Sequence, residues 1–213
     1  MPVMSRVERA FCQSAPWRAF TRRTVVPWAS RGHILHGEVL ELGSGSGAIA
    51  ADLVDRYPIT HLVATDVDPR MVASAERRLA RYVPRVDVRR VDATALPFPD
   101  ASFDVVASFL MLHHVIDWEQ ALAEVVRVLR PGGMFVGYDL VDTAPARLLH
   151  RLDRSPHRLL TPEALRTELT RHQPAVVELD RSLAGLVFRF HSTKSDGADH
   201  GVPTLPPVDR RPR

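Results

Sequence analysis

Residues 39–47 read Val-Leu-Glu-Leu-Gly-Ser-Gly-Ser-Gly, an apolar run that ends in a glycine-rich turn. The apolar part predicts a buried strand, and residues 48–56 after the turn predict a helix. Glycine has no Cβ atom, so the chain can turn sharply here and a ligand can lie directly against the main chain. The free N–H groups at the start of the helix would face that ligand. This stretch therefore predicts a strand, a ligand-binding turn and a helix in succession.

Strand and helix patterns continue to alternate after this turn. The expected strands are 38–42, 61–65, 86–91, 103–108 and 134–139, and the expected helices are 48–56, 69–82 and 118–129. Such alternation requires crossover connections and therefore a parallel sheet. A turn is expected at residues 130–133, which read Arg-Pro-Gly-Gly.

The pattern changes near the C-terminus. Thr161-Pro162-Glu163 predicts the start of a helix that ends near His172, because threonine caps helices and proline suits the first helical position. Two expected strands, 175–179 and 186–191, are joined by a segment too short for a parallel crossover. The prediction is a Rossmann-like, doubly wound α/β fold with helices on both faces of a seven-stranded sheet. The sheet is mostly parallel and has an antiparallel last strand pair.

The two ends of the chain differ from this core. Residues 5–8 have the spacing of a helix capping box, and Pro16 and Pro27 are expected to break the N-terminal helical region. Trp17 and Phe20 on these helices could cover a ligand site as a lid. The expected division is an N-terminal helical lid or appendage at 1–36, the core domain at 37–194, and a proline-rich, disordered tail at 195–213.

Composition excludes several classes of protein. The 213 residues are 45% hydrophobic and carry a net charge of +3, which suits one globular domain. Lys194 is the only lysine, and the arginines are dispersed, so nucleic-acid binding is not expected. The longest apolar stretch, 105–112, is too short to span a membrane, and a cytoplasmic location is expected. The single cysteine, Cys12, excludes a cysteine metal cage, and no metal site is predicted.

Two acids follow the second and third expected strands. A carboxylate at Asp66 can accept both hydroxyl protons of a ribose. The motif Gly43-x-Gly45-x-x-Ala48 also fits a dinucleotide, so these residues alone suit more than one adenosine cofactor. Asp92 discriminates between them, because an acid there can accept a hydrogen bond from the adenine amino group, which nicotinamide enzymes do not usually need.

Six pieces in one order resemble the class I S-adenosylmethionine-dependent methyltransferases, particularly the Methyltransf_11 or UbiE-like subgroup. The resemblance is close over about residues 38–140 and loose over the terminal helix and strand pair. The matching pieces are ELGSGSG at 41–47, DVDPRM at 66–71, DATALPF at 92–98, SFDVV at 102–106, LHHV at 112–115 and LRPGG at 129–133.

The resemblance implies S-adenosylmethionine as the cofactor and a small molecule as the methyl acceptor. The residues implied to bind the cofactor lie at the ends of the first four expected strands or just after them. They are Gly43, Ser44, Gly45 and Gly47 around the methionine part, Glu41 near its amino group, Asp66 at the ribose, Val67 on the adenine, Asp92 and Ala93 at the adenine edge, and Ser108, within segment 107–109, beside the sulfonium.

Simpler roles remain open for the acids. Glu41 could satisfy loop amides, Asp66 could cap the helix that starts at Pro69, and Asp92 could form a turn with its own backbone. Asp104, before the fourth strand, is expected to be structural.

His113 and His114 are the candidate catalytic residues, and Asp139 at the end of the fifth strand is another candidate proton acceptor. They follow strands whose carboxyl ends form the ligand site in this architecture. Either histidine could equally be a structural residue. Positioning of the acceptor could also carry methyl transfer without a base.

Two other functions stay open. An NAD(P)-dependent oxidoreductase would explain the glycine motif, but the chain has no Tyr-x-x-x-Lys pair. A non-catalytic cofactor-binding protein on the same fold is the other alternative. The sequence does not identify the acceptor, the atom that is methylated (O, N or C) or the oligomeric state.

Overall fold

A computed structural model describes residues 14–30, 32–144, 147, 157–172, 174–182 and 185–196. The predicted capping box at 5–8, Cys12 and the tail beyond residue 196 lie outside these residues. The predicted division into lid, core domain and tail therefore stays a prediction.

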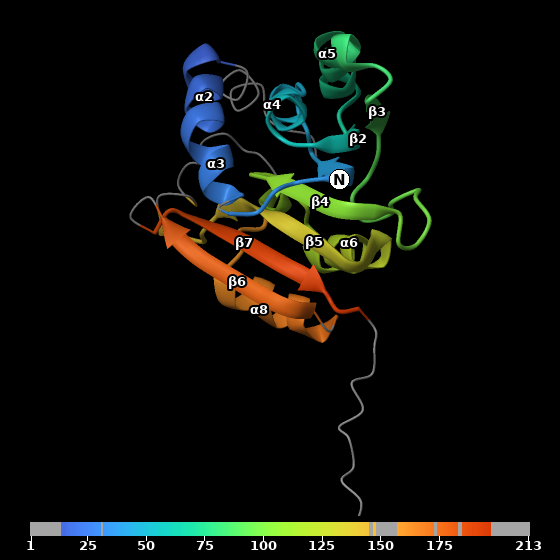
Figure 1. Cartoon of the computed structure of the whole chain (residues 1–213). Helices are drawn as coiled ribbons and strands as arrows, with labels where there is room; N and C mark the ends of the chain where they lie inside the picture. Colours follow the sequence, from blue (N-terminus) through green and yellow to red (C-terminus); the bar gives the residue numbers. More distant parts are fainter. Residues whose placement is uncertain are drawn as a thin grey trace, which may run out of the picture.

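A seven-stranded sheet in the order β3-β2-β1-β4-β5-β7-β6 forms the centre of the fold (Figure 1). β1 pairs in parallel with β2 and β4, while β7 runs antiparallel to both β5 and β6. The predicted mostly parallel sheet with an antiparallel last pair is therefore confirmed. The strands are β1 Gly37–Leu42, β2 Ile59–Asp66, β3 Val86–Arg90, β4 Phe103–Phe109, β5 Leu129–Leu140, β6 Pro174–Ser182 and β7 Val187–Lys194.

Helices cover both faces of this sheet, as predicted (Figure 1). One apolar cluster joins α6 and α8 to alternate residues of the strands, such as Leu40. A second cluster joins α3 (Val26–Ala29), α4 and α5 to the intervening residues, such as Val39. The helices are α4 Ala48–Arg56, α5 Pro69–Leu79 followed by η2 Ala80–Tyr82, η3 Leu112–His114, α6 Trp118–Val128 and α8 Pro162–Arg171. None of the described helices is long and apolar enough to cross a membrane.

Capping side chains start two of these helices. Thr161 Oγ1 accepts the N–H of Ala164 at 3.1 Å, and Pro162 occupies the first turn of α8, as the sequence predicts. At α5 the cap is Asp68, whose Oδ1 accepts the N–H of Arg70 at 2.8 Å. The alternative role of Asp66 as the cap of this helix is therefore wrong.

The N-terminal helical region continues through Pro27, so the break predicted there is wrong, whereas the residues before Ser14, on which the break predicted at Pro16 depends, lie outside the described ones. It comprises α2 Ala15–Phe20, the π-helix η1 Thr21–Val25 and α3 Val26–Ala29. Pro16 lies in the first turn of α2, where a missing N–H costs little. Before Pro27 the turn widens, since the N–H of Val26 bonds to the carbonyl of Thr21, five residues back.

The predicted turn at 130–133 is part of β5 rather than a break before it. β5 pairs with β4 at Phe103↔Leu129 and again at Val105↔Met134. Six residues of β5, 129–134, thus lie opposite three of β4, 103–105, and the segment between the two pairings bulges. Gly132 has a φ of +73°, a conformation that glycine adopts without strain, which lets the bulge form inside the strand.

Candidate active site

The carboxyl ends of β1, β2 and β4 lie side by side at the point where the strand order reverses. Leu42 of β1 is in register with Thr65 of β2 and with Ser108 of β4. The connections after β1 and β4 leave this edge toward opposite faces of the sheet, since α4 and α6 cover opposite faces. A reversal of this kind creates the crevice in which α/β sheets bind ligands.

The glycine turn after β1 is open on one side only. A Cβ atom on Gly43 would lie 2.1 Å from Met111 Cγ, and one on Gly47 would lie 2.9 Å from a methyl group of Leu79. A Cβ atom on Gly45 would have nothing within 4 Å. All three glycines have positive φ angles, between +55° and +73°, so other residues would be strained here. The backbone at Gly45 therefore faces space that a ligand could fill.

Glu41 is a buried acid at the end of β1. Its side chain is 1% exposed, and its Oε2 atom has no hydrogen-bond partner. This oxygen therefore accepts no hydrogen bond from a loop amide, which was the simpler role left open for Glu41. Burial raises the pKa of Glu41 to about 8, and the negative charges of Asp66 and Asp52 add to the increase. The side chain is thus a protonated acid at neutral pH.

Two serine hydroxyls near this edge also lack partners. Ser44 Oγ follows β1 and Ser108 Oγ is near the end of β4, and both atoms are buried without a hydrogen bond. A buried polar atom without a partner costs about 1–3 kcal/mol. Such atoms together with Glu41 at one sheet edge are typical of a site that is completed by a polar ligand.

Asp66 at the end of β2 supports the glycine turn. Its Oδ2 accepts the N–H of Gly45 at 2.9 Å, and its Oδ1 accepts the N–H of Asp68 at 2.8 Å. Burial raises the pKa of Asp66, although these two backbone hydrogen bonds oppose the increase. A carboxylate has about four acceptor positions, so two further donors can still bind. Val67 follows Asp66 and is half-buried.

Asp92 begins the loop after β3 and forms the turn that the sequence left open. Its Oδ1 accepts the backbone N–H of Thr94 at 2.9 Å and the Thr94 hydroxyl at 2.7 Å. Ala93, the next residue, is buried in the apolar cluster that includes Leu40. A turn of this kind fixes the orientation of the acid.

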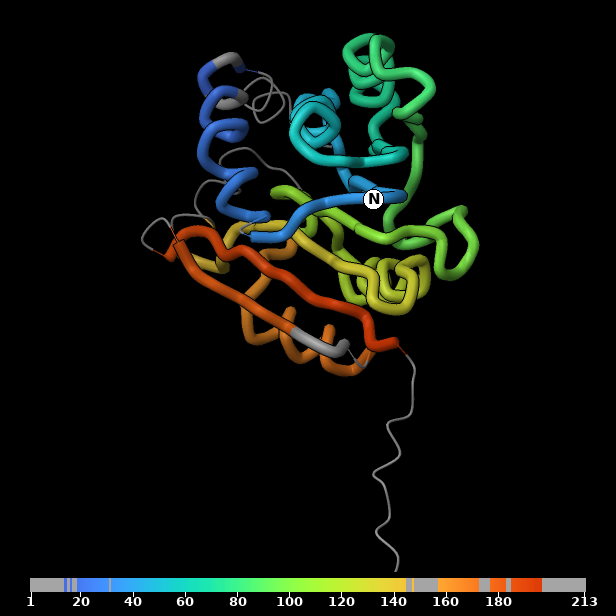
Figure 2. Tube along the Cα trace, viewed as in Figure 1, coloured from blue at the N-terminus to red at the C-terminus, as the bar shows by residue number. Residues whose placement is uncertain are grey.

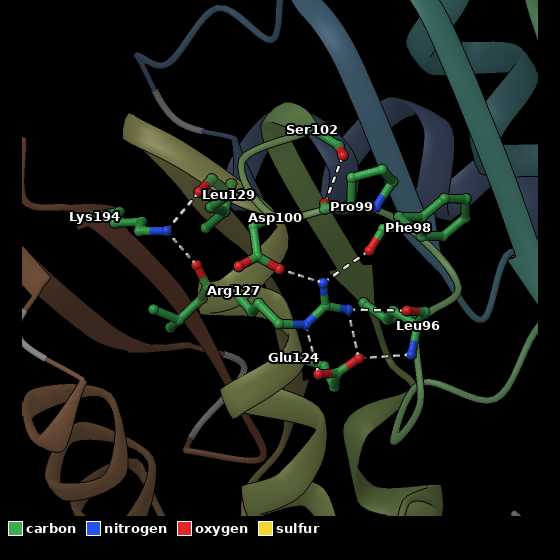
Figure 3. A network of polar contacts seen from close by, with 10 residues as sticks. Leu96, Phe98, Pro99, Asp100, Ser102, Glu124, Arg127, Leu129 and Lys194 are labelled. Atoms are coloured by element: carbon green, nitrogen blue, oxygen red, sulfur yellow. Dashed lines mark hydrogen bonds and ion pairs between the residues drawn. The ribbon is translucent and has the colours of Figure 1, made fainter.

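A network of polar contacts ties the same loop to α6 (Figure 3). Arg127 donates to the carbonyls of Leu96 at 2.9 Å and Phe98 at 2.8 Å, while Glu124 accepts the N–H of Leu96 at 2.7 Å. Glu124 and Arg127 also form an ion pair at 2.8 Å. Lys194 of β7 donates to two carbonyls at the end of α6, at 2.7 Å each. Side chains of α6 thus hold the loop that carries Asp92 in place.

A buried histidine–aspartate pair lies where β4 and β5 end. His113 Nδ1 lies 2.5 Å from Asp139 Oδ1, and these side chains are 1% and 0% exposed. The backbone N–H groups of His113 and Leu140 also donate to the Asp139 carboxylate, at 3.3 and 2.7 Å. A carboxylate can only accept, so Nδ1 carries the proton and Nε2 is the basic nitrogen of His113.

The loop that carries this pair packs on the glycine turn. Met111, two residues before His113, supplies the contact that excludes any side chain at Gly43. The His114 ring lies against the His113 ring, with centroids 4.0 Å apart. The structure therefore brings the candidate catalytic histidines to the edge that holds Glu41.

Other predicted residues lie away from this edge or take structural roles. Asp104 accepts the N–H of Glu38 at 2.8 Å and pairs with Arg130 at 2.7 Å, which agrees with its predicted structural role. Phe20 is exposed and the Trp17 side chain lies outside the described residues, so a lid stays a prediction. The sequence did not predict the contacts of Met111 and Arg127. The one available signal was the spacing of Glu124 and Arg127, three residues apart on a helix, which is typical of an ion pair.

A family described as "Methyltransferase domain" matches residues 40–137, which include the glycine turn, Asp66, Asp92 and both histidines. Residues 40–137 are therefore similar to a class I methyltransferase domain of the UbiE-like type. This finding confirms the resemblance seen in the sequence, and it does not favour the oxidoreductase alternative.

Two relatives are named as methyltransferases of quinone biosynthesis. The demethylmenaquinone methyltransferase of Thermus thermophilus is 40% identical over 98 residues, which are 46% of this chain and 44% of the relative. The ubiquinone/menaquinone biosynthesis C-methyltransferase UbiE of Desulfotalea psychrophila is 38% identical over 135 residues, which are 63% of this chain and 51% of the relative. The chain thus spans about half the length of these relatives.

Solved structures agree with the fold. A Haemonchus contortus phosphoethanolamine N-methyltransferase, in complex with S-adenosylhomocysteine, matches with a TM-score of 0.69 at 14% identity, over 82% of this chain and 52% of that one. The cyclase SpnF matches with a TM-score of 0.69 at 20% identity, over 85% and 84%. At these identities the likeness shows the fold alone, and the fold hosts more than one activity.

Proposed function

We propose that this chain binds S-adenosylmethionine at the carboxyl ends of β1 to β4 and transfers its methyl group to a small-molecule acceptor. One observation carries the proposal: the open glycine turn, the unpartnered Glu41 and the His113–Asp139 pair meet at the edge where the strand order reverses. The methyltransferase family that matches this region supports it.

The residues present fit this cofactor. Its ammonium group would offer a charged donor to the unpartnered Glu41 Oε2, and Ser44 and Ser108 would supply hydroxyls beside it. The open backbone at Gly45 would take the methionine part, with Gly43 and Gly47 shaping the turn. The remaining acceptor positions of Asp66 suit the ribose hydroxyls, Val67 would pack on the adenine, and Asp92 with Ala93 would read the adenine edge.

The chain's own contribution to catalysis would be to position the acceptor and to move a proton. S-adenosylmethionine supplies an electrophilic methyl group on a sulfonium. His113 Nε2 would take a proton from the acceptor, while Asp139 holds the ring and stabilises the imidazolium that results. The buried loop of Met111 would exclude water from the reacting atoms. The bound cofactor would supply the methyl group, and its C–S bond would break as the bond to the acceptor forms.

The names of the relatives favour a quinol as the acceptor and ring carbon as the methylated atom. The histidine–aspartate pair suits such a substrate, because removal of a phenolic proton makes the adjacent ring carbon nucleophilic. Once the methyl group is attached, the ring carbon would lose its own proton to solvent while the protonated His113 returns the first proton to the ring oxygen, which restores the aromatic ring. Because the chain spans only part of each relative, the identity of the acceptor is proposed separately from the methyl transfer itself.

Turnover assays test the proposal. Purified full chain is incubated with S-adenosylmethionine and a panel of reduced quinones, phenols and amines, and the release of S-adenosylhomocysteine is measured. We expect release that depends on a quinol acceptor and falls at least tenfold in His113→Gln. Binding of the cofactor with no release for any acceptor would favour the non-catalytic alternative, and release with amines alone would overturn the quinol assignment.

A further inference from the structure

Three potential metal ligands meet away from the proposed active site, where the N-terminal segment crosses the sheet. His33 lies between α3 and β1, Glu178 lies on β6, and His191 lies opposite Glu178 on β7. Each offers a ligand atom, and these atoms all lie within 4.8 Å of one another. Figure 2 shows that the N-terminal segment passes beside β7, although the two are far apart in the sequence.

The two histidine rings face each other directly. Their centroids are 3.7 Å apart, and their planes differ by 9°. His191 Nδ1 is buried and has no hydrogen-bond partner. Glu178 is exposed and His33 is half-buried, so the cluster has a solvent-facing side through which an ion could enter.

We propose that His33, Glu178 and His191 form a binding site for a divalent zinc ion. Two imidazole nitrogens and one carboxylate are a common zinc ligand set, and a water molecule can complete the tetrahedron. Donors on one tetrahedral zinc ion lie about 3.3 Å apart, given zinc–nitrogen bonds of about 2.0–2.1 Å. The ligand atoms here therefore need to close by at most about 1.5 Å.

Side-chain rotation can supply this movement. Imidazole lone pairs lie in the ring plane, so parallel stacked rings cannot both point at one ion. Binding must turn at least one ring out of the stack, and the exposed Glu178 can follow without repacking a core. A zinc ion would thus replace a ring stack by three ligand bonds.

The neighbouring contacts show what the ion would hold together. Arg189, two residues before His191 and on the same face of β7, donates to the carbonyl of Trp28 at 2.9 Å. Its guanidinium lies 5.5 Å from the centre of the Trp28 ring. This contact already fastens the end of α3 to β7. A bound ion would add a second link a few residues further along, at His33.

Calorimetric titration of zinc chloride into the chelator-treated full chain tests the site. We expect one equivalent to bind with a dissociation constant in the micromolar range or below, and affinity to fall about tenfold or more in His33→Gln and in Glu178→Gln. The matched control is His61→Gln. His61 faces one carboxylate, that of Glu38 at 3.3 Å, and belongs to no such three-residue group among the described residues.

Glu178→Gln keeps the test decisive, because an exposed side chain can be changed without loss of the fold. Equal zinc affinity in the wild type and in Glu178→Gln or His33→Gln would overturn the proposal, as would the absence of binding in the wild type. As a second measurement, zinc should raise the melting temperature of the wild type and of His61→Gln, and raise it less in Glu178→Gln. Equal increases in all three would also contradict the site.

Discussion

The raised pKa of Glu41 predicts that ligand binding releases a proton. In the free protein this acid is buried and protonated up to about pH 8. A ligand ammonium group beside Oε2 favours the ionised acid and so lowers its pKa. Since a group with a pKa of about 8 is about 90% protonated at pH 7, binding of S-adenosylhomocysteine should release about 0.9 proton there.

The size of the pH effect follows from the same pKa. If Glu41 is fully ionised in the complex, the affinity for S-adenosylhomocysteine should rise about 50-fold from pH 6 to pH 8. Calorimetry at pH 7 in buffers of different ionisation enthalpy counts the protons, and titrations across this range give the affinity. In Glu41→Gln both the proton release and most of the rise should disappear. Asp66 also has a raised pKa, and the difference between the two proteins isolates Glu41.

Equal proton release and equal pH dependence in the wild type and in Glu41→Gln would show that Glu41 does not contact the ligand. The free proteins offer an independent check. Above pH 4.5 an unfolded Glu41 ionises while the folded one stays protonated, so stability falls as pH rises toward about 8. Glu41→Gln should therefore stabilise the free protein at pH 7, by up to about 3 kcal/mol.

Three further predictions concern the other parts of the site. Asp66→Asn should weaken S-adenosylhomocysteine binding about tenfold or more by calorimetry, because it removes charge-assisted hydrogen bonds to the ribose; an unchanged dissociation constant would assign Asp66 to the turn alone. His113→Gln and Asp139→Asn should each lower kcat about tenfold or more while S-adenosylhomocysteine affinity changes far less, and full turnover in both variants would make the pair structural. Arg127→Met should raise the KM for S-adenosylmethionine several-fold with kcat nearly unchanged, since it frees the loop of Asp92; a fall in kcat alone would contradict that positioning role.

Local patterns in the sequence predicted most of the fold. Apolar runs bounded by glycine, proline and capping residues identified every strand and the helices α4, α5, α6 and α8, because those signals act over a few residues. The errors arose where neighbours override local preference. Pro27 continues a helix because a π-turn precedes it, and residues 130–133 join β5 because β4 supplies a partner.

The candidate site was predictable only in part, for a similar reason. The glycine turn and Asp66 belong to one local strand–turn–helix unit and the strand after it, so their proximity follows from the fold class. His113 and Asp139 were both named as candidates, but their pairing depends on the register between β4 and β5. The sequence also predicted no metal site, whereas the structure brings His33, Glu178 and His191 together. His33 and His191 are brought together only by tertiary packing, which no local pattern encodes.

The most direct test of the central claim is a calorimetric comparison of S-adenosylhomocysteine with NAD as ligands of the full chain at pH 7.5. The open turn at Gly45, the unpartnered Glu41 and the acids Asp66 and Asp92 predict binding of S-adenosylhomocysteine in the micromolar range, with one site per chain, and no detectable binding of NAD. Binding of NAD without binding of S-adenosylhomocysteine would contradict the assignment of this sheet edge as a methyltransferase site.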